Sequence, residues 1–332
     1  MFNGKSVLIT GGTGTFGKQF VKHLLKNYNT NKIIIFSRDE FKQYEMARKF
    51  QGETKLRFFI GDVRDKDRLK RAFFGVDYIV HAAASKQVVA AEYNPFEAIK
   101  TNIIGAENVI EAAIDSGVQK VVALSTDKAA NPINLYGATK LCSDKLFVAG
   151  NAYAAGKGTL FSVVRYGNVL GSRGSVLPLF LEQKKQGKIT ITDRRMTRFW
   201  ITIEDAISLV ITAFKETEGG EIFVPKIPSL TMEDFAKIIA PECEIEDIGI
   251  RPGEKMHEIM IPADDSRHTF EFNDHYRIMP EFRTWTSDTV QLGKALPEGF
   301  VYASDNNPIT VDKEYFLKVI KKIENKINEM AK

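Results

Sequence analysis

The sequence predicts an α/β fold in which a doubly wound parallel sheet is joined to a smaller C-terminal lobe. In the first half, short β-branched runs alternate with longer amphipathic stretches, which is typical of alternating strands and helices. A glycine-rich turn directly follows the first of these runs, and the alternation stops near residue 171. With 332 residues, 44% of them hydrophobic, the chain is long enough to bury a large core.

Six buried strands are expected in the first half, with helices between them. The strands are Ser6–Thr10, Lys32–Phe36, Leu56–Ile60, Tyr78–His81, Val121–Ser125 and Phe161–Tyr166. The helices include Lys18–Asn27, Asp65–Phe74 and Gly105–Ser116. In the last helix the apolar residues recur at helical spacing and are expected to face the sheet; they are Ala106, Val109, Ile110 and Ala113.

The turn after the first strand, Thr10–Gly17, has the glycine spacing of a dinucleotide site and leads directly into a helix. Without Cβ atoms, Gly11 and Gly14 let backbone N–H groups approach a pyrophosphate. Gly17 lets the helix pack closely on the strand. The first half is therefore predicted to be a Rossmann-type dinucleotide-binding domain.

The segment after the second strand, Ser37-Arg38-Asp39, lies where such a domain contacts the adenosine ribose. Ser37 and Arg38 offer donors to a 2′-phosphate and favour NADP. Asp39 argues the other way, since a carboxylate there could bind the ribose of NAD. After the third strand, Asp62 and Val63 are placed to contact adenine, and capping a helix is a second, compatible role for Asp62.

Thr126-Asp127-Lys128 lies just upstream of Tyr136-x-x-x-Lys140, the residue pair of a hydride-transferring enzyme. Tyr136 and Lys140 are four apart and project from one helix face. A phenol has an ordinary pKa of about 10, so we expect the Lys140 cation to make the phenolate accessible and to hold the nicotinamide ribose. Asp127 and Lys128 add a candidate acid and base; the alternative for them is an exposed turn.

From Gly171 onward glycine, proline and arginine interrupt the pattern. A helix is expected at Ile203–Lys215, a strand at Glu221–Val224 that returns to the first sheet, and a Lys-rich amphipathic helix at Lys313–Met330. We therefore expect an NADP-binding domain over residues 1–170, joined by residues 201–226. Residues 171–200 and 227–332 would form the substrate-binding lobe.

Composition excludes several classes of protein. The net charge is only +4, which does not suit a nucleic-acid binder. The two cysteines form no CxxC pair, which favours a reducing compartment. No signal peptide and no apolar run of the ~20 residues that span a bilayer is seen, so a cytoplasmic protein without membrane association is expected. His81 and His257 lack the spacing of metal ligands, and His81 is expected to be a packed structural residue.

These motifs resemble those of the extended short-chain dehydrogenase/reductase superfamily, in its nucleotide-sugar branch. The Thr-Asp-x step is similar to that of the nucleotide-sugar 4,6-dehydratases, whose retaining members typically carry Glu where this chain has Lys128. With Lys128, the segment Leu124–Lys140 is similar to the C5-inverting UDP-N-acetylglucosamine 4,6-dehydratases, which start pseudaminic acid synthesis. The likeness covers nearly the whole chain and includes Gly171–Val176, Met196–Trp200 and Arg251–Lys255. One departure is Gln87, where the family usually has His.

The resemblance implies NADP as cofactor, UDP-N-acetylglucosamine as substrate and a homo-oligomer such as a hexamer. In this reaction C4 is oxidised, water leaves across C5–C6, and the hydride returns to C6. Tyr136 would be the C4-hydroxyl base, Lys128 the C5 base and Asp127 the C6 acid, with Thr126 bonding the C4 oxygen. The implied cofactor residues are Gly11, Thr13, Gly14, Thr15, Phe16, Gly17, Ser37, Arg38, Asp39, Lys42, Asp62, Val63, Ala82, Ala83, Lys86, Tyr136 and Lys140. The implied substrate residues are Lys86, Asn168, Val169, Arg173, Arg198, Arg251 and Glu254, with Arg194 and Arg195 as weaker candidates.

The proposed acid and base have a conflict of charge. The base Lys128 must be neutral and the acid Asp127 protonated, and contact between them would stabilise the opposite, charged forms. Adjacent residues leaving a strand point to opposite faces, so contact is not required. Desolvation by bound substrate and the positive nicotinamide could lower the pKa of Lys128. Two rival functions are a nucleotide-sugar 4-epimerase, which needs neither residue, and a regulator that binds NADP without turnover.

Overall fold

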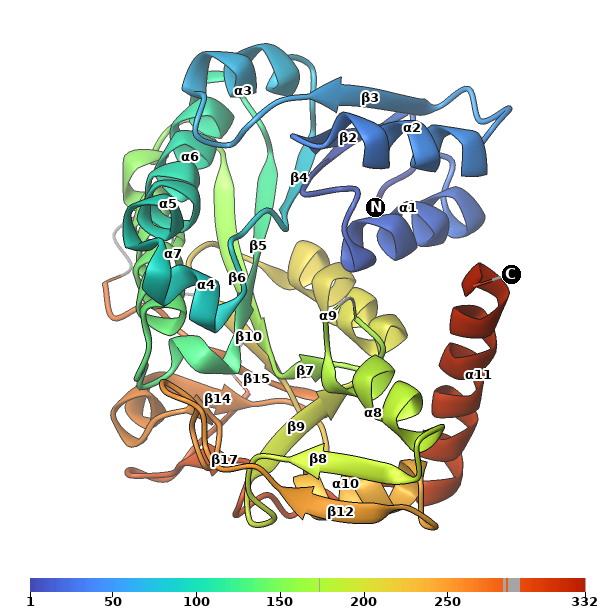
Figure 1. The fold of residues 1–332 in the computed structure, drawn as a ribbon. Helices are drawn as coiled ribbons and strands as arrows, with labels where there is room; N and C mark the ends of the chain where they lie inside the picture. Colours follow the sequence, from blue (N-terminus) through green and yellow to red (C-terminus); the bar gives the residue numbers. More distant parts are fainter. Residues whose placement is uncertain (173, 283–284, 286–292, 332) are drawn as a thin grey trace.

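The computed structural model describes residues 1–172, 174–282, 285 and 293–331, and its centre is a ten-stranded sheet (Figure 1). The strand order is β16-β14-β15-β10-β6-β5-β4-β1-β2-β3. All neighbouring pairs from β10 to β3 are parallel. The bounds of these strands are β1 Ser6–Thr10, β2 Lys32–Ser37, β3 Leu56–Ile60, β4 Tyr78–His81, β5 Lys120–Thr126, β6 Leu160–Tyr166, β10 Ile222–Pro225, β14 Thr269–Glu271, β15 His275–Ile278 and β16 Lys294–Ala295.

The first six strands agree with the sequence prediction to within one residue at each end. Most of their residues are buried from both faces, as in β1, where every residue is buried. This two-sided burial explains why the strands read as continuous β-branched runs without polar alternation. The predicted doubly wound parallel architecture is confirmed.

Helices cover both faces of the sheet (Figure 1). One layer contains α1 Thr15–Asn27, α2 Glu40–Lys49 and α9 Ile203–Glu216, and the other contains α3 Lys66–Phe73, α6 Gly105–Asp115 and α7 Leu135–Tyr153. Several begin at a side chain that accepts a backbone N–H bond, which stabilises the first turn; Asp39, Asp65, Asn134 and Thr202 do so for α2, α3, α7 and α9. In α6 the residues expected to face the sheet are all buried.

Short helical segments surround the carboxyl ends of the central strands. After β4 come α4 Val88–Tyr93, α5 Pro95–Ile99 and a π-helical turn at Lys100–Ile104, which continues into α6. After β5 comes a single 3-10 turn, Asp127–Ala129, and then α7. This turn determines how Asp127 and Lys128 lie, as described below.

The second lobe has a core of its own, in which Trp200 and Phe235 stack with ring centroids 3.9 Å apart. It consists of small sheets and three helices. The sheets pair β7 Asn168–Val169 with β9 Thr197–Ile201 and β11 Ser229–Thr231, β8 Lys188–Ile191 with β12 Glu244–Asp247, and β13 Ile259–Ile261 with β17 Tyr302–Ala303. The helices are α8 Val176–Lys184, α10 Met232–Ile239 and α11 Lys313–Ala331, and a 3-10 segment spans Ala263–His268.

The C-terminal part of the chain differs from the expected division in one respect. The strand expected near 221–224 is β10, which pairs parallel with β6. Beyond it, β15, β14 and β16 come from residues assigned to the substrate lobe, yet they extend the large sheet with antiparallel pairs. They cover the edge that β10 would otherwise expose, a common protection for a sheet edge.

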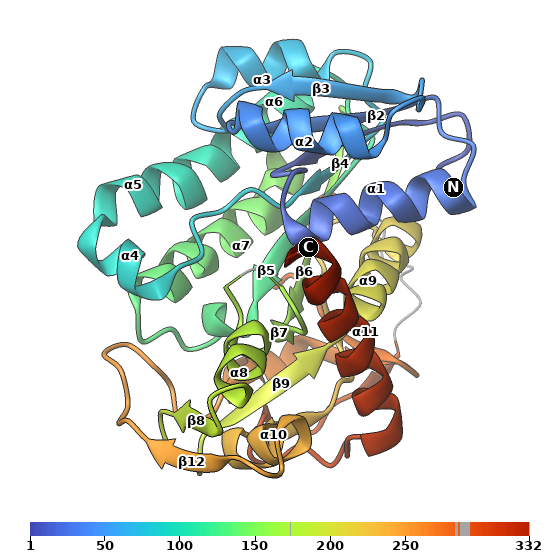
Figure 2. The ribbon, with the colours of Figure 1, turned by 45° about the vertical axis from the view of Figure 1, so that its right-hand side comes forward.

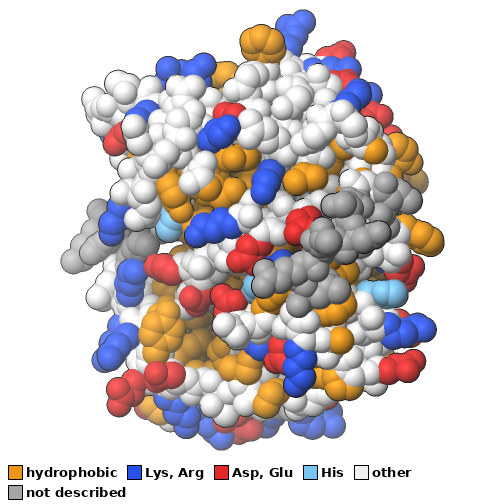
Figure 3. Space-filling view, turned by 180° about the vertical axis from the view of Figure 1, so that it is seen from behind, with side chains coloured by type: hydrophobic (Ala, Val, Ile, Leu, Met, Phe, Trp, Pro, Cys, Tyr) orange, Lys and Arg blue, Asp and Glu red, His pale blue; other side chains and the backbone are white. Residues whose placement is uncertain are grey.

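The C-terminal helix α11 packs on α8 and α10, and Figure 2 shows its end near α1. Phe316 and Ile320 are buried on its inner face, and Lys322 pairs with Glu204 of α9 at 3.0 Å. On the face seen in Figure 3, basic side chains are interspersed with acidic ones. Among the described residues, no helix is both long and apolar enough to span a bilayer.

Candidate active site

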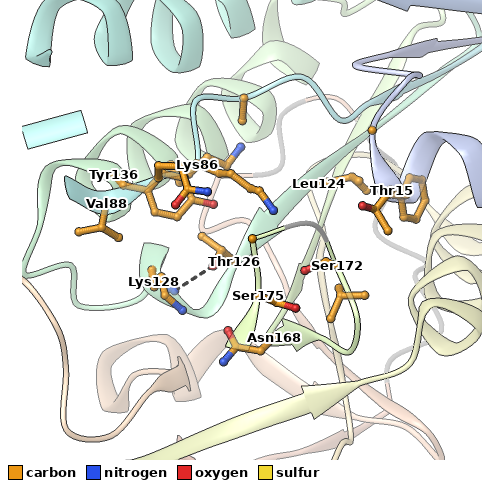
Figure 4. A pocket seen from close by; sticks show the side chains of 18 of the residues that line it. Thr15, Lys86, Val88, Leu124, Thr126, Lys128, Tyr136, Asn168, Ser172 and Ser175 are labelled. Atoms are coloured by element: carbon orange, nitrogen blue, oxygen red, sulfur yellow. Dashed lines mark hydrogen bonds between the residues drawn. The ribbon is translucent and has the colours of Figure 1, made fainter. Parts of the chain in front are cut away.

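A cavity of about 900 Å³ lies at the carboxyl ends of the parallel strands and extends to the second lobe (Figure 4). This is where open α/β sheets bind their ligands. All the non-catalytic cofactor residues expected from the sequence line it: Gly11, Thr13, Gly14, Thr15, Phe16, Gly17, Ser37, Arg38, Asp39, Lys42, Asp62, Val63, Ala82, Ala83 and Lys86. The catalytic and substrate candidates that line it are Thr126, Lys128, Tyr136, Lys140, Asn168, Val169, Arg198, Arg251 and Glu254.

The glycine turn leaves no room for side chains. A Cβ at Gly11 would lie 2.9 Å from the Ala82 backbone, and one at Gly17 would lie 2.4 Å from the Gly12 carbonyl oxygen. Gly11 also has a φ of +64°, which glycine adopts without strain. The start of α1 can therefore approach a pyrophosphate closely, so the residues present fit a dinucleotide.

At the end of β2 the three candidate residues have different surroundings. Ser37 accepts a bond from Gln43 Nε2 at 3.1 Å, and the Arg38 guanidinium lies 3.6 Å from Asp62 with 61% of its side chain exposed. Asp39 caps α2 by accepting from the Lys42 backbone N–H at 2.9 Å and also pairs with the Lys42 side chain. The carboxylate that argued for NAD therefore has two partners within its own helix.

Tyr136 and Lys140 lie on one face of α7, as predicted, and both are buried. Burial raises the pKa of Tyr136 to about 12, and the main opposing charge is Lys128. This is a correction, because Lys140 was expected to be the cation that lowers the pKa of this phenol. Burial lowers the pKa of Lys140, against the attraction of Asp144.

Asp127 and Lys128 are in contact, although strand geometry would have kept their side chains on opposite faces. Because the 3-10 turn begins at Asp127, the two side chains converge, and Lys128 Nζ lies 3.0 Å from Asp127 Oδ1. It also lies 3.2 Å from Glu258 Oε1. Burial would lower the pKa of Lys128, but the carboxylates of Asp127 and Glu258 outweigh burial and raise it. The expected lowering of this pKa by bound substrate and the positive nicotinamide stays a prediction.

Asp127 does not reach the cavity itself. It is 0% exposed and bonds to two residues that do line the cavity, Lys128 and the hydroxyl of Thr126, which donates at 2.9 Å. In Figure 4, Thr126 and Lys128 lie below Tyr136 and Lys86, and Asn168 and Ser175 approach from the second lobe. A role for Asp127 as acid therefore needs one of its two neighbours to carry the proton.

The cations expected for the diphosphate differ in availability. Arg251 is 65% exposed and pairs with Glu254 at 2.9 Å. Arg198 is buried, and its guanidinium donates to the carbonyls of Thr197 and Lys255, so it supports the second lobe and is not a free cation. Arg173 lies outside the described residues. Arg194 and Arg195 pair with Asp247 and Asp193, and neither lines the large cavity.

His81 is 1% exposed, and its Nδ1 lies 2.9 Å from Thr10 Oγ1. Burial, with a smaller contribution from Lys140, lowers its pKa to about 3. It is the packed structural residue expected from the sequence. In the described part of the chain, no group of three or more His, Cys, Asp or Glu side chains could hold a metal ion.

Sequence reasoning missed two features of the site. Glu258 is 1% exposed and touches Lys128, and Asp144 is buried beside Lys140, where it accepts from Ser125 at 2.7 Å. The available signals were weak. Asp144 follows Lys140 by four residues on α7, and Glu258 directly precedes the apolar strand β13.

Comparison with known proteins gives consistent matches. A family model described as polysaccharide biosynthesis protein matches residues 7–280. The chain is 54% identical over 329 residues to the UDP-N-acetylglucosamine 4,6-dehydratase (inverting) of Campylobacter jejuni, covering 96% of this chain and 98% of that one. It is 46% identical over 286 residues to the UDP-glucose 4-epimerase of Rickettsia conorii, covering 84% of each.

Two solved structures share the fold. Pen from Bacillus thuringiensis superposes with a TM-score of 0.88 at 39% identity, covering 98% of this chain and 99% of that one. DesIV, a dTDP-glucose 4,6-dehydratase from Streptomyces venezuelae determined with NAD and TYD bound, has a TM-score of 0.68 at 25% identity, covering 76% of this chain and 86% of that one.

Proposed function

We infer that this chain, which belongs to the polysaccharide biosynthesis protein family, is a UDP-N-acetylglucosamine 4,6-dehydratase of the inverting type. The observation that carries the inference is the presence of two chemical units in one site. Tyr136 and Lys140 suit hydride transfer at a sugar hydroxyl, and Lys128 with its buried partner Asp127 suits the loss of water. The identity to the inverting dehydratase of Campylobacter jejuni extends over nearly the whole of both chains.

NADP is the proposed form of the nicotinamide cofactor. Bound in this site, NADP would supply the hydride acceptor for C4 and the hydride donor for C6. Arg38 is largely exposed at the rim of the cavity and can donate to a 2′-phosphate, while Asp39 is engaged by α2 and Lys42. The contacts of Asp39 therefore support the preference that Ser37 and Arg38 suggested from the sequence.

For C4 oxidation, Tyr136 takes the proton of the C4 hydroxyl. Its buried phenol is a weak acid, and Lys128 is the charge that favours the phenolate. Thr126 lies beside Tyr136, where its hydroxyl can bond the C4 oxygen. Once C4 is a ketone, the proton on C5 becomes acidic, and the chemistry moves to Lys128 and Asp127.

The contact between Lys128 and Asp127 favours the charged pair, but it also provides a path by which both residues can reach their required forms. Moving one proton from Lys128 Nζ to Asp127 Oδ1, across 3.0 Å, converts the charged pair into a neutral amine and a carboxylic acid. The amine then takes the C5 proton, and the acid supplies a proton to the departing C6 oxygen. After water has left, Lys128 is again an ammonium and Asp127 a carboxylate, so the pair is restored without any external acid or base.

Because Asp127 is enclosed, we assign its proton path to the Thr126 hydroxyl. Thr126 Oγ1 lies 2.9 Å from Asp127 Oδ1 and lines the cavity. It can accept the proton of Asp127 while donating its own to the C6 oxygen. This relay replaces the direct contact between Asp127 and substrate that the sequence suggested.

The product tests the proposal. The purified protein with UDP-N-acetylglucosamine and NADP should form a product lighter by one water. We propose that the new C5–H bond forms opposite the broken one, giving the β-L-arabino 4-keto-6-deoxy sugar with solvent deuterium at C5 in D₂O. NMR of the fresh product decides this. A D-xylo product would overturn inversion, and an unchanged mass would overturn dehydration.

A 4-epimerase is the second candidate, because the Rickettsia conorii relative that carries that name is 46% identical. An epimerase returns the hydride to C4, so its product keeps the mass of the substrate. The ion pair between Lys128 and the buried Asp127 would then have no task in the reaction. From the resemblance to the inverting dehydratases, we also propose that the protein is a cytoplasmic homo-oligomer that acts in pseudaminic acid synthesis. Light scattering of the purified protein would give its oligomeric state.

A further inference from the structure

Glu258 is a buried carboxylate that the mechanism above does not use. It is 1% exposed, lines the cavity and lies 3.2 Å from Lys128 Nζ through Oε1. It comes from the second lobe, whereas Lys128 follows β5 of the nucleotide-binding domain. A charged side chain is almost never fully buried without a partner, and the partner of Glu258 here is Lys128.

The backbone around Glu258 is held on both sides. Its N–H donates to Ser304 Oγ at 2.9 Å, and the Ser304 N–H donates back to its carbonyl at 2.8 Å. A few residues earlier, Lys255 Nζ donates to the Ala130 carbonyl at 2.6 Å. The carboxylate is therefore presented to Lys128 from a fixed support and not from a free loop.

Several charged groups surround Lys128. Asp127 and Glu258 are the anions, and Arg198, Lys255 and the phenol of Tyr136 also act on the cluster, with Arg198 3.8 Å from Glu258. Oδ2 of Asp127 and Oε2 of Glu258 are both buried without a hydrogen-bond partner among the described residues. Each carboxylate thus retains capacity to accept a further proton or hydrogen bond.

The geometry restricts the amine. A lysine nitrogen has three positions besides Cε. Here one of them is hydrogen-bonded to Asp127 Oδ1, Glu258 Oε1 forms an ion pair with the same nitrogen at 3.2 Å, and the side chain also lines the cavity. Transfer of the proton to Asp127 leaves the lone pair of the neutral amine directed at Oδ1, and one rotation about the Cε–Nζ bond turns the lone pair to the cavity. In that orientation the two N–H bonds can be directed at Asp127 and Glu258. Without Glu258, Asp127 alone would hold this orientation.

We propose that Glu258 is a positioning residue for the dehydration step, which aims the Lys128 lone pair at C5 and stabilises the ammonium formed there. This rests on the proposed function. The C5–H bond breaks, an N–H bond forms on Lys128, the C–H electron pair becomes the C5–C6 double bond, and the C6–O bond breaks as water takes the Asp127 proton. Glu258 keeps its charge throughout and never needs to touch the sugar.

Glu258→Gln, which keeps the shape and removes the charge, tests this in single turnovers. Oxidation at C4, followed by the absorbance of the reduced cofactor, should proceed within a few-fold of wild type. Water loss and solvent deuterium uptake at C5 should fall by about 10²-fold or more, the usual size of one acid–base contribution. The C4-keto hexose should accumulate, and KM for UDP-N-acetylglucosamine should change little.

Glu221→Gln is the matched control, because Glu221 is equally buried at 1% and lies before the amino end of β10, away from the cavity. It should keep wild-type water loss. Equal losses of C4 oxidation and elimination in Glu258→Gln, or wild-type elimination, would overturn the proposal. If Glu258→Gln does not fold, Glu258→Asp decides, because a retracted carboxylate should slow elimination alone and full-rate elimination would refute positioning. Failure of wild type to release water would instead refute the proposed function.

Discussion

At the residue scale, Lys128 acts on both halves of the proposed chemistry. Its ammonium is the main charge opposing the rise in the pKa of Tyr136, and its neutral form is the proposed C5 base. The two tasks need opposite charges. They can follow one another because Tyr136 acts first, before the proton moves from Lys128 to Asp127.

Lys128→Met separates these tasks. Elimination should be abolished, while NADP binding stays near normal because Lys128 lies outside the glycine turn. The pKa of Tyr136, already about 12, should rise further once the cation is lost and Asp127 remains. At a given pH less phenolate is then present, so C4 oxidation should be slow near neutrality and recover as pH rises. The pH dependence of cofactor reduction measures this shift.

Lys145→Met serves as the control, since Lys145 is exposed on α7 and does not line the cavity. Its pH profile should match that of wild type. A Lys128→Met profile with no upward displacement would mean that another charge governs the Tyr136 phenol.

His81 makes a prediction about stability. Its folded pKa of about 3 lies below the ordinary value of 6.5, so the unfolded chain binds a proton in that range and the folded chain does not. The free energy of unfolding therefore falls as pH drops from 6.5 toward 3, by at most about 1.4 kcal/mol per pH unit from this group. His81→Asn should flatten that part of the profile in urea titrations. An unchanged slope would place the acid sensitivity elsewhere.

At the scale of the elements, the turn from β2 into α2 determines the proposed cofactor preference. Arg38→Ala should weaken NADP binding by about 10-fold or more, the value of a hydrogen bond to a charged group, and leave NAD binding nearly unchanged. Calorimetric Kd values for both dinucleotides test this without relying on turnover. Arg71→Ala, an exposed arginine of α3 away from the cavity, should alter neither. Equal losses for both dinucleotides would remove the support for NADP.

The elements differ in how well the sequence predicts them. The six strands of the first half were predicted closely because most are short apolar runs buried on both faces, a local pattern; β3, with one buried residue, is the exception. The contact between Asp127 and Lys128 was not, because it depends on a 3-10 turn where strand geometry was assumed. Glu258 was missed because its partner Lys128 lies far away in the sequence, and only the docking of the second lobe brings them together.

The same limit explains why the sequence could not distinguish the buried Arg198 from the exposed Arg251. Arg198 belongs to a recognisable Arg-containing segment, but only the folded lobe shows that its donors are used by the carbonyls of Thr197 and Lys255. Residue type indicates a diphosphate ligand, and this role of Arg198 stays a prediction because the residue lines the cavity while its donors are engaged by the second lobe. Arg251, which the sequence ranked equally, remains the exposed candidate.

At the scale of the whole molecule, the site is complete only when the second lobe is docked. The nucleotide-binding domain supplies Tyr136, Lys140 and Lys128, and the second lobe supplies Glu258. Asn134 joins the two parts. Its Oδ1 caps α7 by accepting from the Gly137 N–H at 2.8 Å, and its Nδ2 donates to the Gly253 carbonyl at 2.8 Å.

Asn134→Asp separates the two bonds, because a carboxylate can still cap α7 but cannot donate to Gly253. Losing one hydrogen bond of about 1 kcal/mol should raise KM for UDP-N-acetylglucosamine about fivefold, while Kd for NADP and the thermal midpoint stay near wild type. Hydrogen exchange of residues 251–258 should quicken. Asn94→Asp, which loses a bond to Ala90 within one segment, is the control. An unchanged KM together with faster exchange would show that docking of this segment does not limit substrate binding.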